Sequence, residues 1–336
     1  MKKVLVTGAN GYIARHMVLS LLDQGCKVIG LDNGVNSKNP DMFFGPLAAE
    51  YVHGDIGDLA CLENIFYRHP DIDSVIHFAG RIYVSESLEK PDFYYQANTI
   101  AAFQFFNFVL HRGVRNIVFS SSAGVYGEAK TLPIPENHPR EPINPYGRSK
   151  LATEWILEDM AALFPDLSVT MLRYFNVAGA DMQGRTGQSS PKAHHLIEVA
   201  CEAALGLRDG MALFGTDYNT QDGTCVRDYI HVNDLVNAHL SALKYNAMTN
   251  EKGARAMNCG YGQGYSNLEI INTVKKISGQ DFKVREEARR KGDPAALVAA
   301  NDMIMTALDW RPQYNDIETI VSSAFEWKKR QCDQSR

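Results

Sequence analysis

Short β-branched runs alternate with longer amphipathic stretches over about the first 175 residues of this 336-residue chain. Because the short runs are almost continuously apolar, they predict strands that are buried on both faces, and the alternation predicts an α/β fold with a doubly wound parallel, Rossmann-like sheet. In such sheets ligands bind at the carboxyl ends of the strands. The expected strands are Val4–Thr7, Lys27–Asp32, Glu50–His53, Ser74–Phe78, Asn116–Ser120 and Ser168–Phe175, and the expected helices are about Tyr12–Gln24, Leu59–His69, Pro91–Arg112 and Tyr146–Leu163.

The pattern changes after Asn176, where a polar, glycine-rich stretch follows and apolar periodicity becomes intermittent. A further strand-like run, Asp228–Val232, leads into a helix expected at about Val236–Lys244. From Gly253 onward, short segments predict a smaller C-terminal α+β lobe. We therefore expect a cofactor-binding domain over 1–176, joined by about 226–245, and a substrate lobe over 177–225 and 246–336.

Composition excludes several classes of protein. The net charge of −5 provides no basic surface for nucleic acid, and no apolar run approaches the ~18 residues of a membrane span. The amino end begins a strand directly, so we expect no signal peptide. Six scattered cysteines without a C-x-x-C motif favour reduced thiols in the cytoplasm over disulfides or a metal site.

A glycine-rich turn follows the first expected strand and opens the first expected helix. Gly8 and Gly11 permit a tight turn that brings backbone N–H groups close to a pyrophosphate, and the helix dipole favours the same anion. Ala14 takes the third small position, which the dinucleotide fingerprint tolerates. A simple turn is the alternative interpretation.

Asp32 favours the dinucleotide interpretation. It ends the second expected strand about twenty residues beyond the glycines, where a carboxylate binds the ribose 2′-OH. A capping aspartate would not need that position. Because the carboxylate would repel a 2′-phosphate, the predicted cofactor is NAD rather than NADP.

Tyr146 and Lys150 lie four residues apart at the start of an expected helix and so share one face. An adjacent ammonium favours the phenolate form of a tyrosine, which would suit general acid–base chemistry. A surface Tyr–Lys pair is the alternative. Ser122 changes the balance, because it follows a predicted strand and could complete a proton-handling group with the pair.

These motifs, Gly8-x-x-Gly11, Ser122 and Tyr146-x-x-x-Lys150, resemble the extended short-chain dehydrogenase/reductase family. Over almost the whole chain, longer blocks are similar to the UDP-hexose 4-epimerases of that family, which act on UDP-glucose and UDP-galactose. Related dehydratases and decarboxylases carry an acidic residue after the serine motif, where this chain has Ala123 and Gly124. The longer blocks are Leu31–Asn33, Gly54–Ile56, His77–Gly80, Pro145–Lys150, Leu172–Asn176 and Asp222–Val232.

The resemblance implies reversible C4 epimerisation of a UDP-hexose through a transient 4-keto sugar, with tightly bound NAD. Tyr146 would exchange the O4 proton, Lys150 would lower the Tyr146 pKa and hold the nicotinamide ribose, and Ser122 would share the hydrogen bond at O4. The alternatives are a UDP-N-acetylglucosamine 4-epimerase or bifunctional epimerase, a nucleotide-sugar reductase or dehydrogenase, and a non-catalytic NAD-binding regulator.

The resemblance also implies further site residues and a homodimer. Leu297 matches a gate position at C2 of the sugar, and Gly124 stands where threonine is usual. The expected dimer interface uses the helices near Pro91–Arg112 and Tyr146–Leu163, with Phe103, Phe106 and Leu110, although such apolar stripes are more often core. Besides Gly8, Gly11, Asp32, Tyr146 and Lys150, the expected cofactor residues are Tyr12, Ile13, Asn33, Asp55, Ile56, Phe78, Ala79, Gly80, Asn98 and Tyr174. Besides Ser122 and Tyr146, the expected substrate residues are Asn176, His195, Arg227, Arg290, Asp293 and Leu297. Without the resemblance, the two arginines would be interpreted as solvated surface charges.

Overall fold

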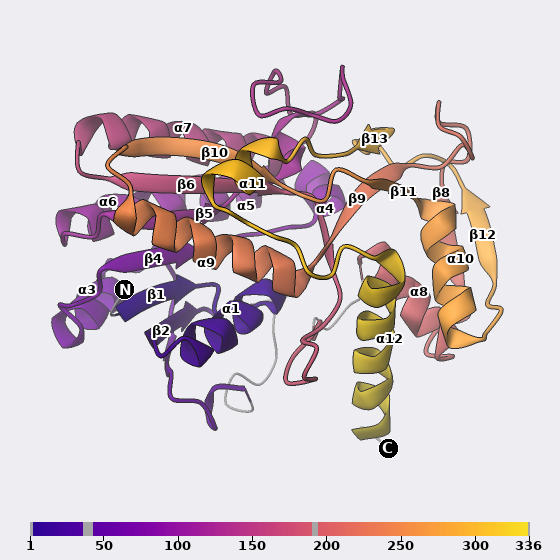
Figure 1. Ribbon diagram of the computed structural model, residues 1–336, viewed down its shortest axis with the longest axis horizontal. Helices are drawn as coiled ribbons and strands as arrows, with labels where there is room; N and C mark the ends of the chain where they lie inside the picture. The colour runs from indigo at the N-terminus through magenta and orange to yellow at the C-terminus, as the bar shows by residue number, and fades with distance from the viewer. Residues whose placement is uncertain (1–2, 36–42, 190–193, 335–336) are drawn as a thin grey trace.

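A computed structural model describes residues 3–35, 43–189 and 194–334. Its main element is a seven-stranded parallel sheet in the order β10-β6-β5-β4-β1-β2-β3 (Figure 1). This confirms the predicted doubly wound class. The strands are β1 (Lys3–Thr7), β2 (Lys27–Asp32), β3 (Glu50–His53), β4 (Ser74–His77), β5 (Asn116–Ser120), β6 (Ser168–Tyr174) and β10 (Gly253–Cys259).

Helices cover both faces of this sheet because successive strand residues point to opposite sides. In β1, Val4 and Val6 pack into one core with α1 (Tyr12–Asp23), α9 (Val232–Met248) and α11 (Asp302–Ala307). Leu5 packs into a second core on the other face. The helices of that core are α3 (Leu59–Arg68), α6 (Ala101–His111) and α7 (Pro145–Leu163).

The smaller lobe combines short strands and three helices. In it β9 (Val226–His231) pairs with β7 (Asn176–Ala178), β11 (Gly264–Ser266) and β13 (Ala296–Leu297). A separate pair joins β8 (Met211–Phe214) to β12 (Val284–Glu287). Helices α8 (Leu196–Ala204), α10 (Asn267–Ser278) and α12 (Ile317–Gln334) pack together in a third core.

Three expectations need correction. Strand β10 pairs with β6 in the large sheet, although its residues fall within the range 246–336 expected in the smaller lobe. The helix expected over Pro91–Arg112 is divided into α5 (Pro91–Tyr95), a π-helical turn (Gln96–Ile100) and α6. Phe106 and Leu110 are fully buried in the core, so of the three expected interface residues on that helix only Phe103 reaches the surface.

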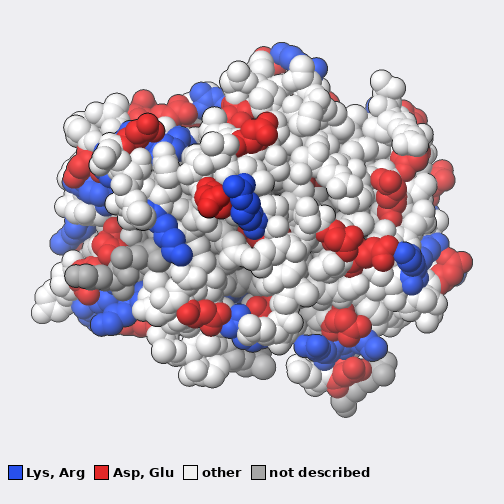
Figure 2. All heavy atoms as spheres, in the orientation of Figure 1, with Lys and Arg blue, Asp and Glu red and all other residues white. Residues whose placement is uncertain are grey.

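Short elements near the strand ends complete the fold: α4 (Val84–Glu89) and a 3₁₀ turn (Ala123–Val125). On the face drawn in Figure 2, acidic and basic side chains are interspersed. Among the helices in the described ranges, none is long and apolar enough to cross a membrane.

Candidate active site

A cavity of about 1390 Å³ opens at the carboxyl ends of the large sheet and is closed on its other side by the smaller lobe. Except for Asn98 and Lys150, every residue that the sequence analysis assigned to the cofactor, the substrate or the chemistry lines this cavity. The structure therefore brings together residues from Gly8 to Leu297 in one continuous space.

The turn after β1 is shaped by close approach of the backbone. Gly8 has a φ of +66°, and a Cβ there would lie 2.7 Å from the amide nitrogen of Ala79. Gly11 precedes α1 and offers no side chain to cap its first amides. Those amides face the cavity at a helix N-terminus, so the turn fits a pyrophosphate group.

Asp32 ends β2 beside this turn and is partly exposed to the cavity. Its carboxylate accepts hydrogen bonds from the backbone amides of Asn10 at 3.1 Å and Gly34 at 2.7 Å. Burial raises the pKa of Asp32, and these two amides oppose that effect. Asn33 donates to Asp55 at 2.7 Å, which fixes the neighbouring wall next to Ile56. The carboxylate and its place fit a ribose diol.

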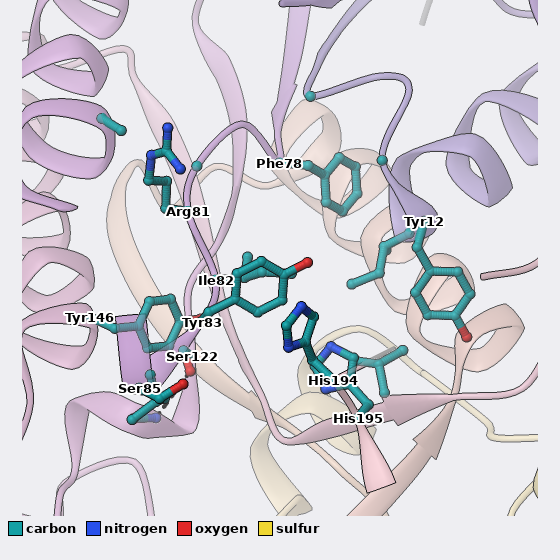
Figure 3. Close-up of a pocket in the computed structure, with 18 of the residues that line it drawn as sticks. Tyr12, Phe78, Arg81, Ile82, Tyr83, Ser85, Ser122, Tyr146, His194 and His195 are labelled. Atoms are coloured by element: carbon teal, nitrogen blue, oxygen red, sulfur yellow. Dashed lines mark hydrogen bonds between the residues drawn. The ribbon is translucent and has the colours of Figure 1, made fainter. Parts of the chain in front are cut away.

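Tyr146 lies in the first turn of α7, where Pro145 and the Asn144 cap start the helix. The Asn144 side chain accepts a hydrogen bond from the amide of Gly147 at 2.9 Å. Burial raises the pKa of the Tyr146 phenol, while its hydrogen bond with the Ser122 hydroxyl acts in the opposite direction. The phenol and the serine thus form a hydroxyl pair at the wall of the cavity (Figure 3).

Lys150 lies one helical turn further along α7 and is almost fully buried. Its Nζ donates to the carbonyl oxygen of Ser120 at 2.9 Å. Burial lowers the Lys150 pKa to about 8, and the negative charge of Glu154 opposes this shift. At Tyr146 the effect of burial dominates, and the pKa of the phenol is raised.

Asn98 lies in the π-helical turn behind the cavity wall. Its side-chain oxygen accepts from the Arg81 amide at 2.7 Å, and its nitrogen donates to the Arg81 carbonyl at 3.0 Å. The same nitrogen donates to the Ser149 hydroxyl at 3.0 Å. Asn98 therefore fixes the loop after β4 onto α7. This loop includes Gly80, and the cavity wall beside it includes Phe78 and Ala79.

The far end of the cavity is built by the smaller lobe. Pairing of β13 with β9 sets Leu297 opposite Arg227. Arg227 lies 3.6 Å from the carboxylate of Asp293 in an ion pair, and the Arg290 guanidinium stacks 3.8 Å from the centre of the Phe214 ring. Two arginines at one end of a cavity suit a diphosphate, because each guanidinium can bond two oxygens.

The remaining predicted residues line the middle. Tyr12, Ile13 and Tyr174 are contributed by the cofactor half, and Asn176 and His195 by the start of the smaller lobe. His195 precedes α8, and burial lowers its pKa, which favours the neutral imidazole. In the described residues no group of three potential metal ligands is found.

Sequence reasoning missed a contact across the cavity. The rings of Tyr83, just before α4, and His194, just before α8, lie with their centres 4.1 Å apart and their planes tilted by 43° (Figure 3). The two residues are 111 positions apart in sequence (194 minus 83), and no local pattern links them. Phe214 beneath Arg290 was missed for the same reason.

A doubly wound sheet with this turn, Asp32 and a Ser–Tyr–Lys group defines an NAD-dependent enzyme of the short-chain dehydrogenase/reductase class. Residues 4–260 match the family model described as the NAD dependent epimerase/dehydratase family. The chain belongs to that family.

Relatives and solved structures support the same assignment over nearly the full length. A UDP-glucose 4-epimerase of Azospirillum brasilense is 46% identical over 99% of this chain and 93% of its own. A crystal structure of UDP-glucose 4-epimerase from Bifidobacterium longum, in complex with NAD+ and UDP, has a TM-score of 0.92 at 36% identity and covers 99% of both chains. The UDP-Glc/GlcNAc 4-epimerase of Campylobacter jejuni has a TM-score of 0.84 at 41% identity, over 98% of this chain and all of its own.

Proposed function

We propose that this chain is a UDP-glucose 4-epimerase, an isomerase that reversibly inverts C4 of a UDP-hexose while NAD stays bound. The observation that carries the proposal is the hydroxyl pair of Ser122 and Tyr146, placed in one cavity between the Gly8–Asp32 end and the Arg227–Arg290 end. One end fits the dinucleotide and the other a sugar diphosphate, so the sugar ring would lie at the hydroxyl pair.

The residues of the pair manage a single proton. Tyr146 accepts the proton from the sugar O4 as the C4–H bond breaks, and Ser122 holds O4 by a hydrogen bond. Bound NAD would accept the hydride from C4 in the first half-reaction and would return it to C4 in the second. The 4-keto sugar then rotates within the site and presents the other face of C4. Tyr146 returns the proton to O4, and C4 now has the opposite configuration. The proton and the hydride removed in the first half-reaction are both restored in the second.

Lys150 stabilises the charge changes at Tyr146 from the next helical turn. Its ammonium is buried at the end of β5, where a positive charge favours the phenolate form of Tyr146 that accepts the O4 proton. In this proposal, the cofactor is held by Gly8, Gly11, Asp32 and Asn33. Asn98 positions the loop after β4 next to the cofactor. The cofactor end of the cavity is lined by Tyr12, Ile13, Asp55, Ile56, Phe78, Ala79, Gly80 and Tyr174.

Epimerisation is favoured over dehydration by the residues after Ser122. Ala123 and Gly124 offer no acid that could protonate a leaving hydroxyl. In the substrate half, Arg227 and Arg290 hold the diphosphate, while Asn176, His195 and Asp293 line the space around it. Leu297 and Gly124 lie against the sugar.

A second candidate activity is epimerisation of UDP-N-acetylhexosamines. A Cβ at Gly124 would lie 3.3 Å from the Ser122 hydroxyl oxygen and 3.6 Å from the Tyr146 ring, so glycine leaves space beside the pair that threonine would fill. At position 297, the leucine side chain likewise takes up less space than a tyrosine would. The similarity to the Campylobacter jejuni UDP-Glc/GlcNAc 4-epimerase is consistent with this broader activity.

We further propose the domain division of the sequence analysis, with β10 and α11 moved to the cofactor domain and β9 moved to the smaller lobe. We also propose a homodimer and a cytoplasmic location. The apolar side chains of Phe93, Ile100, Phe103 and Trp155 are exposed on α5, the π turn, α6 and α7, and a second copy would cover them. The free thiols of all six cysteines suit a reducing compartment.

The deciding experiment incubates the purified protein with a panel of UDP-sugars and no added NAD. We expect UDP-galactose and UDP-glucose to interconvert, and the released cofactor after denaturation to be NAD. Stoichiometric consumption of added NAD would instead indicate a dehydrogenase or reductase. A protein that holds NAD but changes no sugar would indicate a regulator.

A further inference from the structure

Three consecutive serines at the end of β5 each contact α7. The carbonyl oxygen of Ser120 accepts from Lys150 at 2.9 Å, and the hydroxyl of Ser121 donates to Glu154 at 2.5 Å. The hydroxyl of Ser122 lies beside Tyr146 on the cavity wall (Figure 3). The three partners on α7 are four residues apart and therefore share one helix face.

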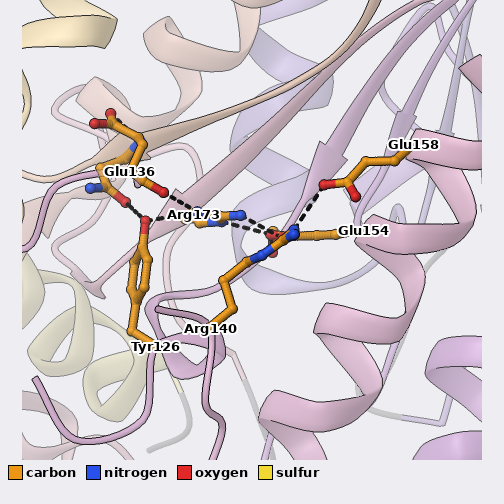
Figure 4. A network of polar contacts seen from close by, with 8 residues as sticks. Tyr126, Glu136, Arg140, Glu154, Glu158 and Arg173 are labelled. Carbon is orange, nitrogen blue, oxygen red and sulfur yellow. Dashed lines mark hydrogen bonds and ion pairs between the residues drawn. The ribbon is translucent and has the colours of Figure 1, made fainter. Parts of the chain in front are cut away.

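Of these three partners, Glu154 is the one for which neither the motif nor the proposed chemistry gives a role. Its carboxylate is completely buried, and a buried carboxylate must be paired to be tolerated. Arg173 of β6 supplies the pairing through two hydrogen bonds, from Nε at 2.9 Å and from Nη2 at 2.7 Å. Arg140 adds a weaker ion pair at 3.6 Å (Figure 4).

Arg173 is itself held from its other side. Its Nη1 donates to the Tyr126 hydroxyl at 2.9 Å and to the Glu136 carbonyl at 3.1 Å. The Tyr126 hydroxyl donates in turn to Asn258 of β10 at 2.6 Å. The carboxylate of Glu154 thus lies where α7, β5 and β6 meet, fixed by a side chain that cannot shift freely.

We propose that Glu154, held by Arg173, is a positioning residue that sets the distance between Ser122 and Tyr146. It does not line the cavity, so it acts through its bond to Ser121, the residue next to Ser122. Because proton transfer to O4 needs both hydroxyls in reach of one oxygen, a small slip of β5 along α7 separates them. The proposal rests on the proposed epimerase activity.

The same carboxylate also affects Lys150, one turn away. Its negative charge raises the Lys150 pKa against the lowering effect of burial, and so helps to keep the ammonium charged. The other groups around the lysine are the Phe119 ring, 4.9 Å from Nζ, and His77, whose pKa is lowered by burial and then by the Lys150 charge. The groups that face Glu154 are Ser121, Arg173 and Arg140, and its charge also acts on Lys150 and on the Tyr126 phenol.

Two variants and a matched control test the proposal. Ser121→Ala removes the link to β5 and leaves the Glu154–Arg173 pair in place. Glu154→Gln keeps the shape of the side chain and removes its charge. Glu158→Gln lies one turn further along α7, where it removes a partly exposed partner of Arg140, and serves as the control.

We expect Ser121→Ala and Glu154→Gln to lower kcat at least 10-fold while KM and the NAD content stay within about 2-fold of wild type. Glu154→Gln should also move the alkaline limb of the kcat profile to lower pH, because Lys150 then loses its proton earlier; Ser121→Ala should not. Glu158→Gln should match wild type. A folded Ser121→Ala with wild-type kcat overturns the proposal, even where Glu154→Gln fails to fold.

If the wild-type chain is inactive, the proposed function is refuted. The positioning role can then still be tested by a measurement that does not depend on activity. The Tyr146 pKa is measured in the NAD-loaded protein by ultraviolet titration, as the difference from Tyr146→Phe. Since the Ser122 hydrogen bond lowers that pKa, Ser121→Ala should raise it. An unchanged pKa overturns the positioning role independently of any activity.

Discussion

The Nζ atom of Lys150 donates a hydrogen bond to the carbonyl oxygen of Ser120, 2.9 Å away. The ammonium is therefore anchored to the last residue of β5, and the phenol of Tyr146 pairs with Ser122 instead. This arrangement separates two tasks. The hydroxyl pair handles the proton, and the lysine supplies a fixed positive charge beneath it.

The first prediction concerns the phenol. Tyr146→Phe should lower kcat by about 100-fold or more, because general acid–base catalysis contributes at least that factor. The NAD content should not change, because the cofactor turn and Asp32 are untouched. Steady-state assays with UDP-galactose and cofactor release after denaturation measure both quantities. Activity near the wild-type level would contradict the assigned role of Tyr146.

The second prediction concerns the cofactor carboxylate. Asp32→Asn should weaken NAD retention by about 10- to 100-fold, the value of a charge-assisted hydrogen bond, and should improve tolerance of NADP. Equilibrium dialysis of both dinucleotides against the stripped protein tests this. Asp71→Asn, which removes an exposed carboxylate, is the control. Equal NAD affinity in Asp32→Asn and wild type would rule out the ribose contact.

The third prediction concerns the residue opposite Arg227. Leu297→Tyr should reduce kcat/KM for UDP-N-acetylgalactosamine at least 10-fold and leave that for UDP-galactose within about 3-fold, because added bulk on the C2 side rejects only the larger group. The ratio of the two kcat/KM values reports the effect. A wild-type chain without any activity on the N-acetylated sugar would remove the proposed second activity.

The fourth prediction concerns acid stability. Burial lowers the pKa of His16 and His239 to about 4 and that of His77 and His231 to about 3. An unfolded chain binds these protons near pH 6.5, whereas the folded chain does not, so the free energy of unfolding falls as the pH drops below about 6.5. Each histidine contributes a slope of about 1.4 kcal/mol per pH unit until its folded pKa is reached.

Urea unfolding midpoints between pH 8 and pH 5 check this slope. They should be nearly constant above about pH 7 and fall steeply below pH 6. His239→Gln should show a shallower slope than wild type, while the exposed His111→Gln should show the same slope. A midpoint that is unchanged down to pH 5 would contradict the prediction.

The fifth prediction concerns the exposed apolar surface of α6 and α7. The wild-type chain should have about twice the 37.4 kDa mass of one copy in light scattering. Phe103→Glu combined with Trp155→Glu should shift it to the mass of one copy, because each places a charge in the expected interface. Tyr67→Glu, at a side chain 86% exposed on α3, should leave the mass unchanged. A monomeric wild type would refute the dimer.

The central strands could be predicted from the sequence because they are buried on both faces. Lys27–Asp32 and Asn116–Ser120 were predicted with the bounds that the structure has, and so was the edge strand Glu50–His53, which is only partly buried. In contrast, β10 was missed because its sequence, GARAMNC, contains no β-branched or aromatic residue. The segment is a strand because it pairs with β6, and this pairing cannot be predicted from the strand propensity of its own residues.

The helix expected over Pro91–Arg112 is present, but its π-helical turn was missed for a related reason. Nothing in Gln96–Ile100 resembles a helix breaker, since the segment lacks glycine and proline. The π turn places Asn98 so that it can bond Arg81 and Ser149, and these are tertiary contacts. Similarly, the motifs around Gly8 and Tyr146 are local and were recognised, whereas the pairing of Ser120 with Lys150 requires the folded chain.

The position of β10 also has a consequence for synthesis. The ribosome delivers β6 about eighty residues before β10, and the intervening chain belongs largely to the smaller lobe. Until residue 259 has emerged, β6 has an unpaired edge whose N–H and C=O groups can pair with another strand. A nascent or truncated chain that ends before Gly253 should therefore be prone to aggregate, and the complete chain closes that edge with its own late strand.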